Sequence, residues 1–337
     1  MTANPTTPAR LMQIAWGFAP GLIVETAVKA GIFDSLLDQP LTIEEAARKL
    51  KVSNRGLAAL MNALVGLQLL AKDKEQRFQL TNESRLFLVS SSPASLARFF
   101  KQISTHLMPS WLDMSAALRS GEPYQTFDRE EDGGRFFADF VESLFAVNFP
   151  AANALAAHLG IARTERPMRV LDIATGSGVW GIALARQSPR VTVTAVDWPA
   201  VIPIATKSVR QHGLEAQFKF EAGDILETNF GTGQDVAILG HILHSEGEER
   251  ARLLLKRVHD ALVPGGTVAV AEFLVDEDRS GPVLGLLFSV TMFLNTEHGQ
   301  TWSFQELRSL LEQAGFLDVA TLDAPGFSPL ILARRSH

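Results

Sequence analysis

The sequence contains no cysteine and is short of positive charge. Without cysteine, the 337-residue chain can form no disulfide, use no thiolate nucleophile and offer no cysteine ligand to zinc, which fits a reducing compartment. Its 31 lysine and arginine residues are outnumbered by 37 aspartate and glutamate residues, so the net charge is −6 and the sequence pI about 5.8. Non-specific binding to nucleic acid therefore has little electrostatic support.

Long apolar runs and targeting signals are also missing from the sequence. The stretch MTANPTTPARLMQ at the start lacks the apolar core of a signal peptide. The longest apolar run, 282–294, is too short to span a bilayer and contains Ser289 and Thr291. What remains is a globular composition, 46% hydrophobic and 20% charged, in a chain long enough for two domains. We expect a cytoplasmic protein that binds neither nucleic acid nor a membrane.

The first part of the chain predicts helices followed by a hairpin. Apolar residues recur at helical spacing through 8–37, and Pro20-Gly21 is expected to break that run. Thr42 with Glu45 predicts a capping box that opens one short helix, and Ser53 is expected to cap a second. The second helix carries the apolar residues Leu57, Leu60, Met61 and Leu64. A strand, a charged turn and a strand follow, which completes a winged-helix pattern.

A winged helix serves either DNA binding or dimerisation. A recognition helix usually presents arginine, lysine, asparagine or glutamine to base edges. The polar residues of this second helix and its end are few, namely Asn54, Arg55, Asn62 and Gln68. Together with the acidic net charge and the apolar first helix, this favours a dimerisation module. A regulator that senses a small ligand is kept as a distant alternative.

Beyond residue 95 the sequence predicts two further regions. Residues 95–160 are mostly helical and rich in aromatics, as expected for a buried layer that also forms the wall of an apolar pocket. From residue 168, short β-branched runs alternate with helical stretches, at 168–174, 191–197, 216–222, 235–240 and 267–275, and two more strands flank Pro325-Gly326. This rhythm predicts an α/β fold with a Rossmann-like, doubly wound, mostly parallel sheet. Ligands of such sheets bind beyond the carboxyl ends of the strands.

The loop after the first of these strands identifies the ligand. LDIATGSGVWG contains the spacing G-x-G-x-x-G, which is typical of dinucleotide binding. However, Asp172 precedes the glycines and Asp224 follows the third strand, and both would repel a pyrophosphate. Asp197 after the second strand suits a ribose in either ligand. S-adenosylmethionine has no phosphate and carries an ammonium and a sulfonium, so the acidic glycine loop favours this methyl donor over NAD.

With these motifs the chain resembles the class I S-adenosylmethionine-dependent O-methyltransferases of the plant caffeate and bacterial small-molecule type. The resemblance rests on LDIATGSGVWG, AVDWPAVI, GDIL, HILHSEGEE and VPGGTVAVAE, and it extends to the winged-helix region. It implies a winged-helix dimerisation domain at 1–105, a helical linker and substrate layer at 106–160, and a Rossmann-like methyltransferase domain at 161–337. A homodimer and a small-molecule acceptor are expected partners.

The resemblance also implies which residues form the site. Gly176, Asp197, and Asp224 with Ile225 would hold the methionine, ribose and adenine parts of the cofactor. The full set expected at the cofactor is Asp172, Gly176, Gly178, Asp197, Trp198, Gly223, Asp224 and Ile225. His244 matches the catalytic base, with Glu272 as the acid that flanks it. The residues expected to line the acceptor pocket are Phe140, Leu144, Phe145, Asn148, Phe288, Met292 and Asn295.

Three positions depart from the family pattern. Ser245 stands where an aspartate usually follows the histidine, Thr301 stands at a second flanking glutamate, and Gly240 replaces a lysine beside the adenine. A metal pair of His241 with Glu246 would need a third ligand and a suitable second shell, so no metal is expected. The acidic run Glu246–Glu249 is expected to form a solvated face or helix caps. The expected activity is metal-independent methylation of a hydroxyl, phenolic in kind, on an aromatic or polyketide-like molecule. The alternatives are N- or C-methylation, or a relative that does not methylate.

Overall fold

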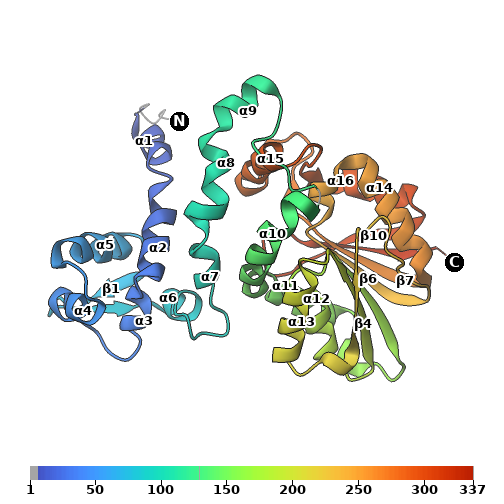
Figure 1. The fold of residues 1–337 in the computed structure, drawn as a ribbon, viewed down its shortest axis with the longest axis horizontal. Coiled ribbons are helices and arrows are strands. Elements are labelled where there is room, and N and C mark those ends of the chain that lie inside the picture. The colour runs from blue at the N-terminus through green and yellow to red at the C-terminus, as the bar shows by residue number, and fades with distance from the viewer. Residues whose placement is uncertain (1–6, 129, 337) are drawn as a thin grey trace, which may run out of the picture. The chain divides into compact units, whose positions relative to one another are not determined.

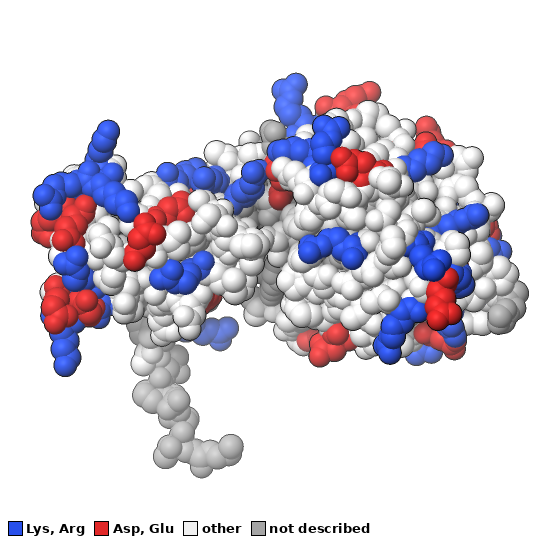
Figure 2. All heavy atoms as spheres, turned by 90° about the horizontal axis from the view of Figure 1, so that it is seen from below, with Lys and Arg blue, Asp and Glu red and all other residues white. Residues whose placement is uncertain are grey.

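The chain folds into two compact units (Figure 1). The computed structural model describes residues 7–128 and 130–336. One unit comprises Met1–Pro109 and the other Ser110–His337. They are called here the N-terminal and the C-terminal unit. On the face drawn in Figure 2, lysine and arginine side chains are interspersed with aspartate and glutamate over both units.

The N-terminal unit begins with two apolar helices, α1 (Ala9–Ala15) and α2 (Ala19–Lys29). The prediction of a break at Pro20-Gly21 is wrong, because the helices are separated at residues 16–18 and Pro20 lies in the first turn of α2. Proline is accepted there because a first-turn N–H has no acceptor within the helix. Taken together, α1, α2 and the turn between them form the stretch Ala9–Lys29. Among the described residues, this stretch alone has the length and apolar composition of a membrane-crossing helix, and 22% of its most apolar part is buried.

The predicted helix, turn, helix and hairpin follow in that order. After α3 (Ile32–Ser35) come α4 (Ile43–Leu50), α5 (Asn54–Gly66), β1 (Leu70–Lys72) and β2 (Phe78–Leu80). The capping box of α4 is confirmed, since Glu45 Oε2 accepts from the Thr42 amide at 2.8 Å and Thr42 Oγ1 accepts from the Glu45 amide at 3.3 Å. Ser53 caps α5 by accepting from the Gly56 amide at 3.1 Å.

The apolar face of α5 fixes the core of this unit. Leu57, Met61 and Leu64 are buried, and they pack in one cluster with residues of α2, α3, α4 and the hairpin. The cluster includes no residue of α1, and large apolar side chains of α1 and of the turn before α2 stay exposed, namely Leu11, Met12, Ile14, Trp16 and Phe18. A row of this size is typical of a contact surface.

Short helices lead from the N-terminal unit into the C-terminal unit. They are α6 (Asn82–Phe87), α7 (Ala97–Phe100), α8 (Met108–Leu112) and α9 (Met114–Ser120), with a π-helical turn at Ile103–Leu107. Two longer helices then open the C-terminal unit, α10 (Glu130–Phe140) and α11 (Phe145–His158). The region predicted as helical and aromatic is therefore helical.

A seven-stranded sheet forms the centre of the C-terminal unit, in the order β10-β11-β7-β6-β3-β4-β5. Its strands are β3 (Met168–Ile173), β4 (Val191–Asp197), β5 (Phe218–Ala222), β6 (Gln234–Gly240), β7 (Leu262–Ala271), β10 (Phe316–Leu322) and β11 (Leu330–Arg335). All neighbours pair in parallel except β11, which runs against both β10 and β7. The prediction of a mostly parallel sheet with a closing hairpin is confirmed. The expected strand at 267–275 is divided, because β8 (Leu274–Val275) leaves the sheet to pair with β9 (Trp302–Ser303).

Helices cover both faces of this sheet (Figure 1). Successive residues of a strand face opposite ways, so Val170 packs with α11, α12 (Val179–Ala185) and α13 (Ile202–Gln211), whereas Leu171 packs with α14 (Leu243–Ala261) and α16 (Phe304–Gln313). The remaining long helix is α15 (Val283–Asn295). Because both faces are covered, the central strands β3 and β6 are buried over most of their length, and polar residues of the site stand at or just beyond the strand ends.

Candidate active site

A cavity of about 140 Å³ lies at the carboxyl ends of β3, β4 and β6. Eight of the residues predicted for the site line it: Leu144, Asn148, Gly176, Asp197, Trp198, Asp224, Ile225 and His244. They come from the helical layer and from the loops after four different strands. The topology of the parallel sheet therefore brings together residues that are a hundred positions apart in the sequence.

The glycine loop turns sharply and approaches its neighbours closely. Gly176 and Gly178 have φ angles of +56° and +78°, which disfavour residues with a side chain. At Gly181 a Cβ atom would lie 2.9 Å from Val193 Cγ1 and 3.0 Å from Asp172 Oδ2. The third glycine is therefore needed for packing α12 on the sheet, while the first lines the cavity.

Asp172 does not line the cavity. Its side chain is fully buried behind the loop, where Oδ2 accepts from Thr175 Oγ1 at 2.8 Å and from the Gly181 amide at 2.9 Å, and Oδ1 has no partner. Burial raises the pKa of Asp172 to about 7 against these hydrogen bonds. The carboxyl group braces the loop from behind, a geometry that gives it no direct contact with a ligand in the cavity.

Asp197 does reach the cavity, at the end of β4. Its carboxylate accepts from the Gly176 amide at 2.7 Å and from the Trp198 amide at 2.8 Å. Burial raises its pKa to about 6, although both hydrogen bonds act in the opposite direction. Asp197 thus links the first and second motifs and offers a carboxylate to a ligand.

Two residues that were not predicted for the site, Arg250 and Glu246, lie beside Asp224 of the GDIL motif. Asp224 Oδ2 lies 3.3 Å from Arg250 Nη2, and Arg250 Nε in turn donates to Glu246 Oε2 at 2.6 Å. The expectation that Glu246 is solvated is wrong, since only 12% of its side chain is exposed and it lines the cavity with Arg250. The run EGEE at 246–249 does not show in the sequence which of its side chains faces the cavity. Gly247 has non-helical angles and turns the chain within α14, which changes the direction of the residues around it.

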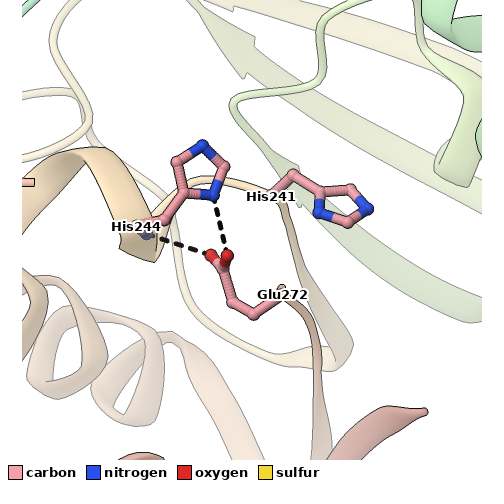
Figure 3. Close-up of side chains that lie close together, drawn as sticks. All are labelled: His241, His244 and Glu272. Carbon is pink, nitrogen blue, oxygen red and sulfur yellow. Dashed lines mark hydrogen bonds and ion pairs between the residues drawn. The ribbon is translucent and has the colours of Figure 1, made fainter. Parts of the chain in front are cut away.

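His244 and Glu272 form a buried pair at the start of α14 and just after β7 (Figure 3). His244 Nδ1 lies 2.7 Å from Glu272 Oε2, and the His244 amide donates to Oε1 at 3.1 Å. Burial opposes ionisation of Glu272, yet the charge and hydrogen bonds of His244 bring its pKa below the usual glutamate value. The ionised carboxylate fixes the proton on Nδ1, so that Nε2 is left as a free acceptor.

His241 lines the same cavity three residues earlier. It has a φ of +64°, its amide donates to the Ala271 carbonyl at 2.8 Å, and its Nδ1 is buried without a partner. Burial lowers its pKa to about 4, so the ring is neutral. One ligand atom each from His241, His244 and Glu272 lie within 4.8 Å of one another. The carboxylate of this group is already engaged by His244.

The predicted acceptor residues divide into two sets. Leu144 and Asn148 line the cavity, and the Phe288 ring lies 4.9 Å from the His244 ring, edge on. The structure does not place Phe140, Phe145, Met292 or Asn295 on the cavity. Phe145 stacks on His212 and Phe149. The side chain of Asn295 accepts a hydrogen bond from Gln125 Nε2 and donates one to the Thr291 carbonyl. Helical spacing alone does not show which face of such an apolar helix meets the ligand.

The remaining departures from the predicted site have local reasons. Gly178 and Gly223 set the loop angles without lining the cavity, and Glu272 acts from behind His244. Residues that were not named individually but also line it include Phe127, Phe137, Val141 and Trp180. The first three lie in the stretch 95–160 that was predicted to form a pocket wall, and Trp180 lies in the glycine motif. At Gly240 a Cβ atom would lie 2.2 Å from Trp180 Nε1, so the glycine there makes room for the indole.

The fold and the acid-lined glycine loop define an S-adenosylmethionine-dependent methyltransferase. The O-methyltransferase domain family model matches residues 127–317, and the O-methyltransferase dimerisation domain model matches residues 12–90. The chain belongs to the O-methyltransferase family and carries its dimerisation domain at the N-terminus. S-adenosylmethionine is its methyl donor.

Individual relatives cover nearly the whole chain. The 3-hydroxy-5-methyl-1-naphthoate 3-O-methyltransferase of Streptomyces sahachiroi is 30% identical over 94% of this chain and 91% of its own. The tetracenomycin polyketide synthesis 8-O-methyl transferase TcmO of Streptomyces glaucescens is 29% identical over 97% of both chains. Human N-acetylserotonin methyltransferase, solved in complex with S-adenosylmethionine, superposes with a TM-score of 0.83 at 25% identity and covers all of both chains.

Proposed function

We propose that this enzyme transfers the methyl group of S-adenosylmethionine to a phenolic hydroxyl of an aromatic, polyketide-like small molecule, with His244 as the general base and no metal. The observation that carries the proposal is the hydrogen bond of 2.7 Å between His244 Nδ1 and the buried Glu272 carboxylate. This bond holds the imidazole in the tautomer whose Nε2 accepts a proton, at the wall of the cofactor cavity.

The chemistry needs such a base. A phenol near neutral pH is mostly protonated, and its neutral oxygen attacks a sulfonium methyl poorly. Bound S-adenosylmethionine would supply the methyl group, so that its C–S bond would break as the O–CH₃ bond forms, while His244 takes the proton of the hydroxyl. Glu272 stabilises the imidazolium that forms. The base contributes typically about 10²–10⁴-fold, and holding the two reactants in line contributes much of the rest.

The surroundings of His244 favour an aromatic acceptor. Phe273 stacks on Phe288 with ring centroids 3.9 Å apart, and both rings lie beside His244.

Ser245 cannot replace the missing second acid, because its hydroxyl donates to the Ile242 carbonyl at 2.9 Å. Thr301 is buried, and a threonine hydroxyl carries no charge with which to replace the second glutamate. Glu272 is thus the one acid that we assign to His244.

On the donor side, we assign the methionine end of the cofactor to Gly176, its ribose to Asp197, and its adenine to Trp198 and Asp224 with Ile225. These residues line one continuous cavity from the glycine loop to the third motif. Asp172, Gly178 and Gly223 serve this site by shaping its loops rather than by contact.

The direct test is a mass-spectrometric screen of phenols and aromatic polyketides with isotope-labelled S-adenosylmethionine. A product heavier by one CH₂ unit that carries the label is expected, and excess chelator should leave the rate unchanged. Loss of activity with chelator, restored by one divalent metal, would overturn the metal-independent part of the proposal.

N-methylation is a second candidate, because the N,N-dimethyltransferase OxyT of Streptomyces rimosus is 28% identical over 94% of this chain. An uncharged amine attacks a sulfonium without prior loss of a proton, so its methylation would depend less on His244. The same screen with amines beside phenols separates the two. Labelled product from amines alone would replace O-methylation with N-methylation.

We also propose that the enzyme is a homodimer through residues 1–100. Met12, Ile14 and Trp16 are 54%, 64% and 63% exposed, more apolar surface than an isolated helix pair keeps in water. Light scattering at micromolar concentration is expected to give twice the chain mass, and Trp16→Glu should shift it toward one. Leu253→Glu, at an exposed apolar site on α14, is the matched control and should stay dimeric. A monomeric wild type would end this proposal.

A further inference from the structure

The imidazole of His241 has no role in the proton transfer, although it lines the cavity beside the base. Its ring centroid lies 6.4 Å from that of His244 and 5.3 Å from that of Phe273. Figure 3 shows the ring beside the His244–Glu272 pair and turned away from it. Because this polar side chain lines the cavity, it is available to a ligand.

The burial of one ring nitrogen decides the tautomer. A neutral imidazole has one N–H donor and one acceptor nitrogen. His241 Nδ1 is buried, and no group of the described residues forms a hydrogen bond with it. An orphaned N–H in the interior is rarer than an orphaned acceptor, so the lone pair belongs on Nδ1 and the hydrogen on Nε2. His244 has the reverse arrangement, because its Nδ1 faces the Glu272 carboxylate.

We infer that His241 is a specificity residue that donates an Nε2–H hydrogen bond to a second oxygen of the acceptor, next to the hydroxyl that His244 deprotonates. The two imidazoles then recognise two groups of the acceptor. His244 accepts from the hydroxyl, and His241 donates to a neighbouring carbonyl or ether oxygen. This inference rests on the proposed function and names the acceptor class within it: aromatic molecules whose reacting hydroxyl has an oxygen acceptor alongside.

The backbone at His241 supports a dedicated position. A φ of +64° carries some strain for any residue with a side chain, although histidine adopts it more readily than most. The strain is held by the hydrogen bond from the His241 amide to the Ala271 carbonyl at 2.8 Å, which ties the end of β6 to the end of β7. Strain of this kind persists where the surroundings over-determine it, and it gathers at ligand sites.

The test uses two isomeric probes, 1-hydroxyanthraquinone, whose hydroxyl lies beside a carbonyl, and 2-hydroxyanthraquinone, whose hydroxyl does not. Their binding to the enzyme loaded with S-adenosylhomocysteine is measured by calorimetry, without turnover. Wild type should prefer the first isomer, and His241→Phe should reduce that preference about 5- to 10-fold, the typical worth of one hydrogen bond. His241→Asn keeps a donor and tolerates the backbone angle, so it is the matched control that should retain most of the preference.

Three outcomes overturn the inference. In the first, wild type binds both isomers equally or binds neither. In the second, His241→Phe weakens the binding of both isomers by the same factor. In the third, His241→Phe weakens the binding of S-adenosylhomocysteine as much as that of the isomers. If the variants do not fold, nitrogen NMR of wild type decides, since a neutral ring with the hydrogen on Nδ1 contradicts the assignment. The base assignment fails separately, through full turnover by His244→Ala while the isomer preference persists.

Discussion

Two buried carboxylates near the strand ends of the C-terminal unit behave in opposite ways. Asp172 behind the glycine loop and Glu272 behind His244 are both withdrawn from water, with 0% and 2% exposure. Burial raises the pKa of Asp172 to about 7, whereas the pKa of Glu272 is lowered although burial opposes it. The two differ in their partners, since Asp172 accepts from neutral donors and Glu272 faces an imidazole.

The same difference separates the donor side of the site, at the glycine loop, from the acceptor side, at His244. On the donor side, Asp172 and Asp197 are held by backbone amides and a hydroxyl, which compensate only part of the lost hydration. On the acceptor side, Glu272 is compensated by a side chain that can become a cation. The hydrogen bonds at the glycine loop thus leave the pKa of Asp172 raised, whereas the charge and hydrogen bonds of an imidazole bring the pKa of Glu272 below its usual value. A cationic partner lowers the pKa of a buried carboxylate further than neutral donors do. We expect the cationic methyl donor to supply that charge to Asp197.

The largest expected effect is on the acceptor side. His244→Ala should lower kcat by about two or more orders of magnitude, because the phenol proton loses its acceptor. Affinity for S-adenosylmethionine should stay near wild type, measured by calorimetry. His158→Ala, at an exposed histidine at the end of α11, is the control and should keep full turnover. Near-full turnover in His244→Ala would show that the acceptor ionises unaided or is not a hydroxyl.

The donor side should respond in binding rather than in chemistry. Asp197→Ala removes a charged hydrogen-bond acceptor from the ribose, and we expect S-adenosylmethionine and its demethylated product to lose about 1.5–3 kcal/mol of binding free energy. In wild type, affinity should weaken as the pH falls through about 6, where Asp197 takes up a proton. Calorimetry across pH measures both, and unchanged affinity in the variant would remove the ribose assignment.

A smaller loss is expected when Glu272 is made neutral. Glu272→Gln keeps the size of the side chain but turns an NH₂ group toward either the His244 amide or Nδ1, both of which donate in wild type. We expect kcat to fall by about tenfold, between wild type and His244→Ala, with KM little changed. Steady-state kinetics measures this, and a variant as active as wild type would mean that Glu272 does not stabilise the imidazolium.

The smallest effect tests the pKa of Asp172. Its folded pKa of about 7 lies above the unfolded value, so its contribution to stability is full below about pH 4 and is lost as the pH rises through 7. Asp172→Asn should make the melting temperature less dependent on pH over that range, by a few degrees at most. Scanning calorimetry at several pH values measures it. An unchanged slope would show that Asp172 is ionised throughout, like Glu272.

The pattern of residues predicted most of the architecture. Thr42 with Glu45 and Ser53 fixed two helix starts, because these caps act within one turn of the chain. Runs such as VTVTAVD predicted strands because they are rich in β-branched residues, and the helical stretch between successive runs predicted their parallel pairing. The motif glycines and the candidate base His244 could be predicted because each lies in a short motif that the resemblance identifies.

The sequence by itself determined the order of elements, the methyl donor and the candidate base, since caps, strand runs and glycine turns act over a few residues. Tertiary structure alone decided that Asp172 lies behind the loop, that Glu246 turns inward to Arg250, and that Phe145 faces away from the cavity. It also decided that His241 lies beside the base with one nitrogen buried. These features depend on which side chains meet across the sheet ends, where segments a hundred residues apart are joined only by packing.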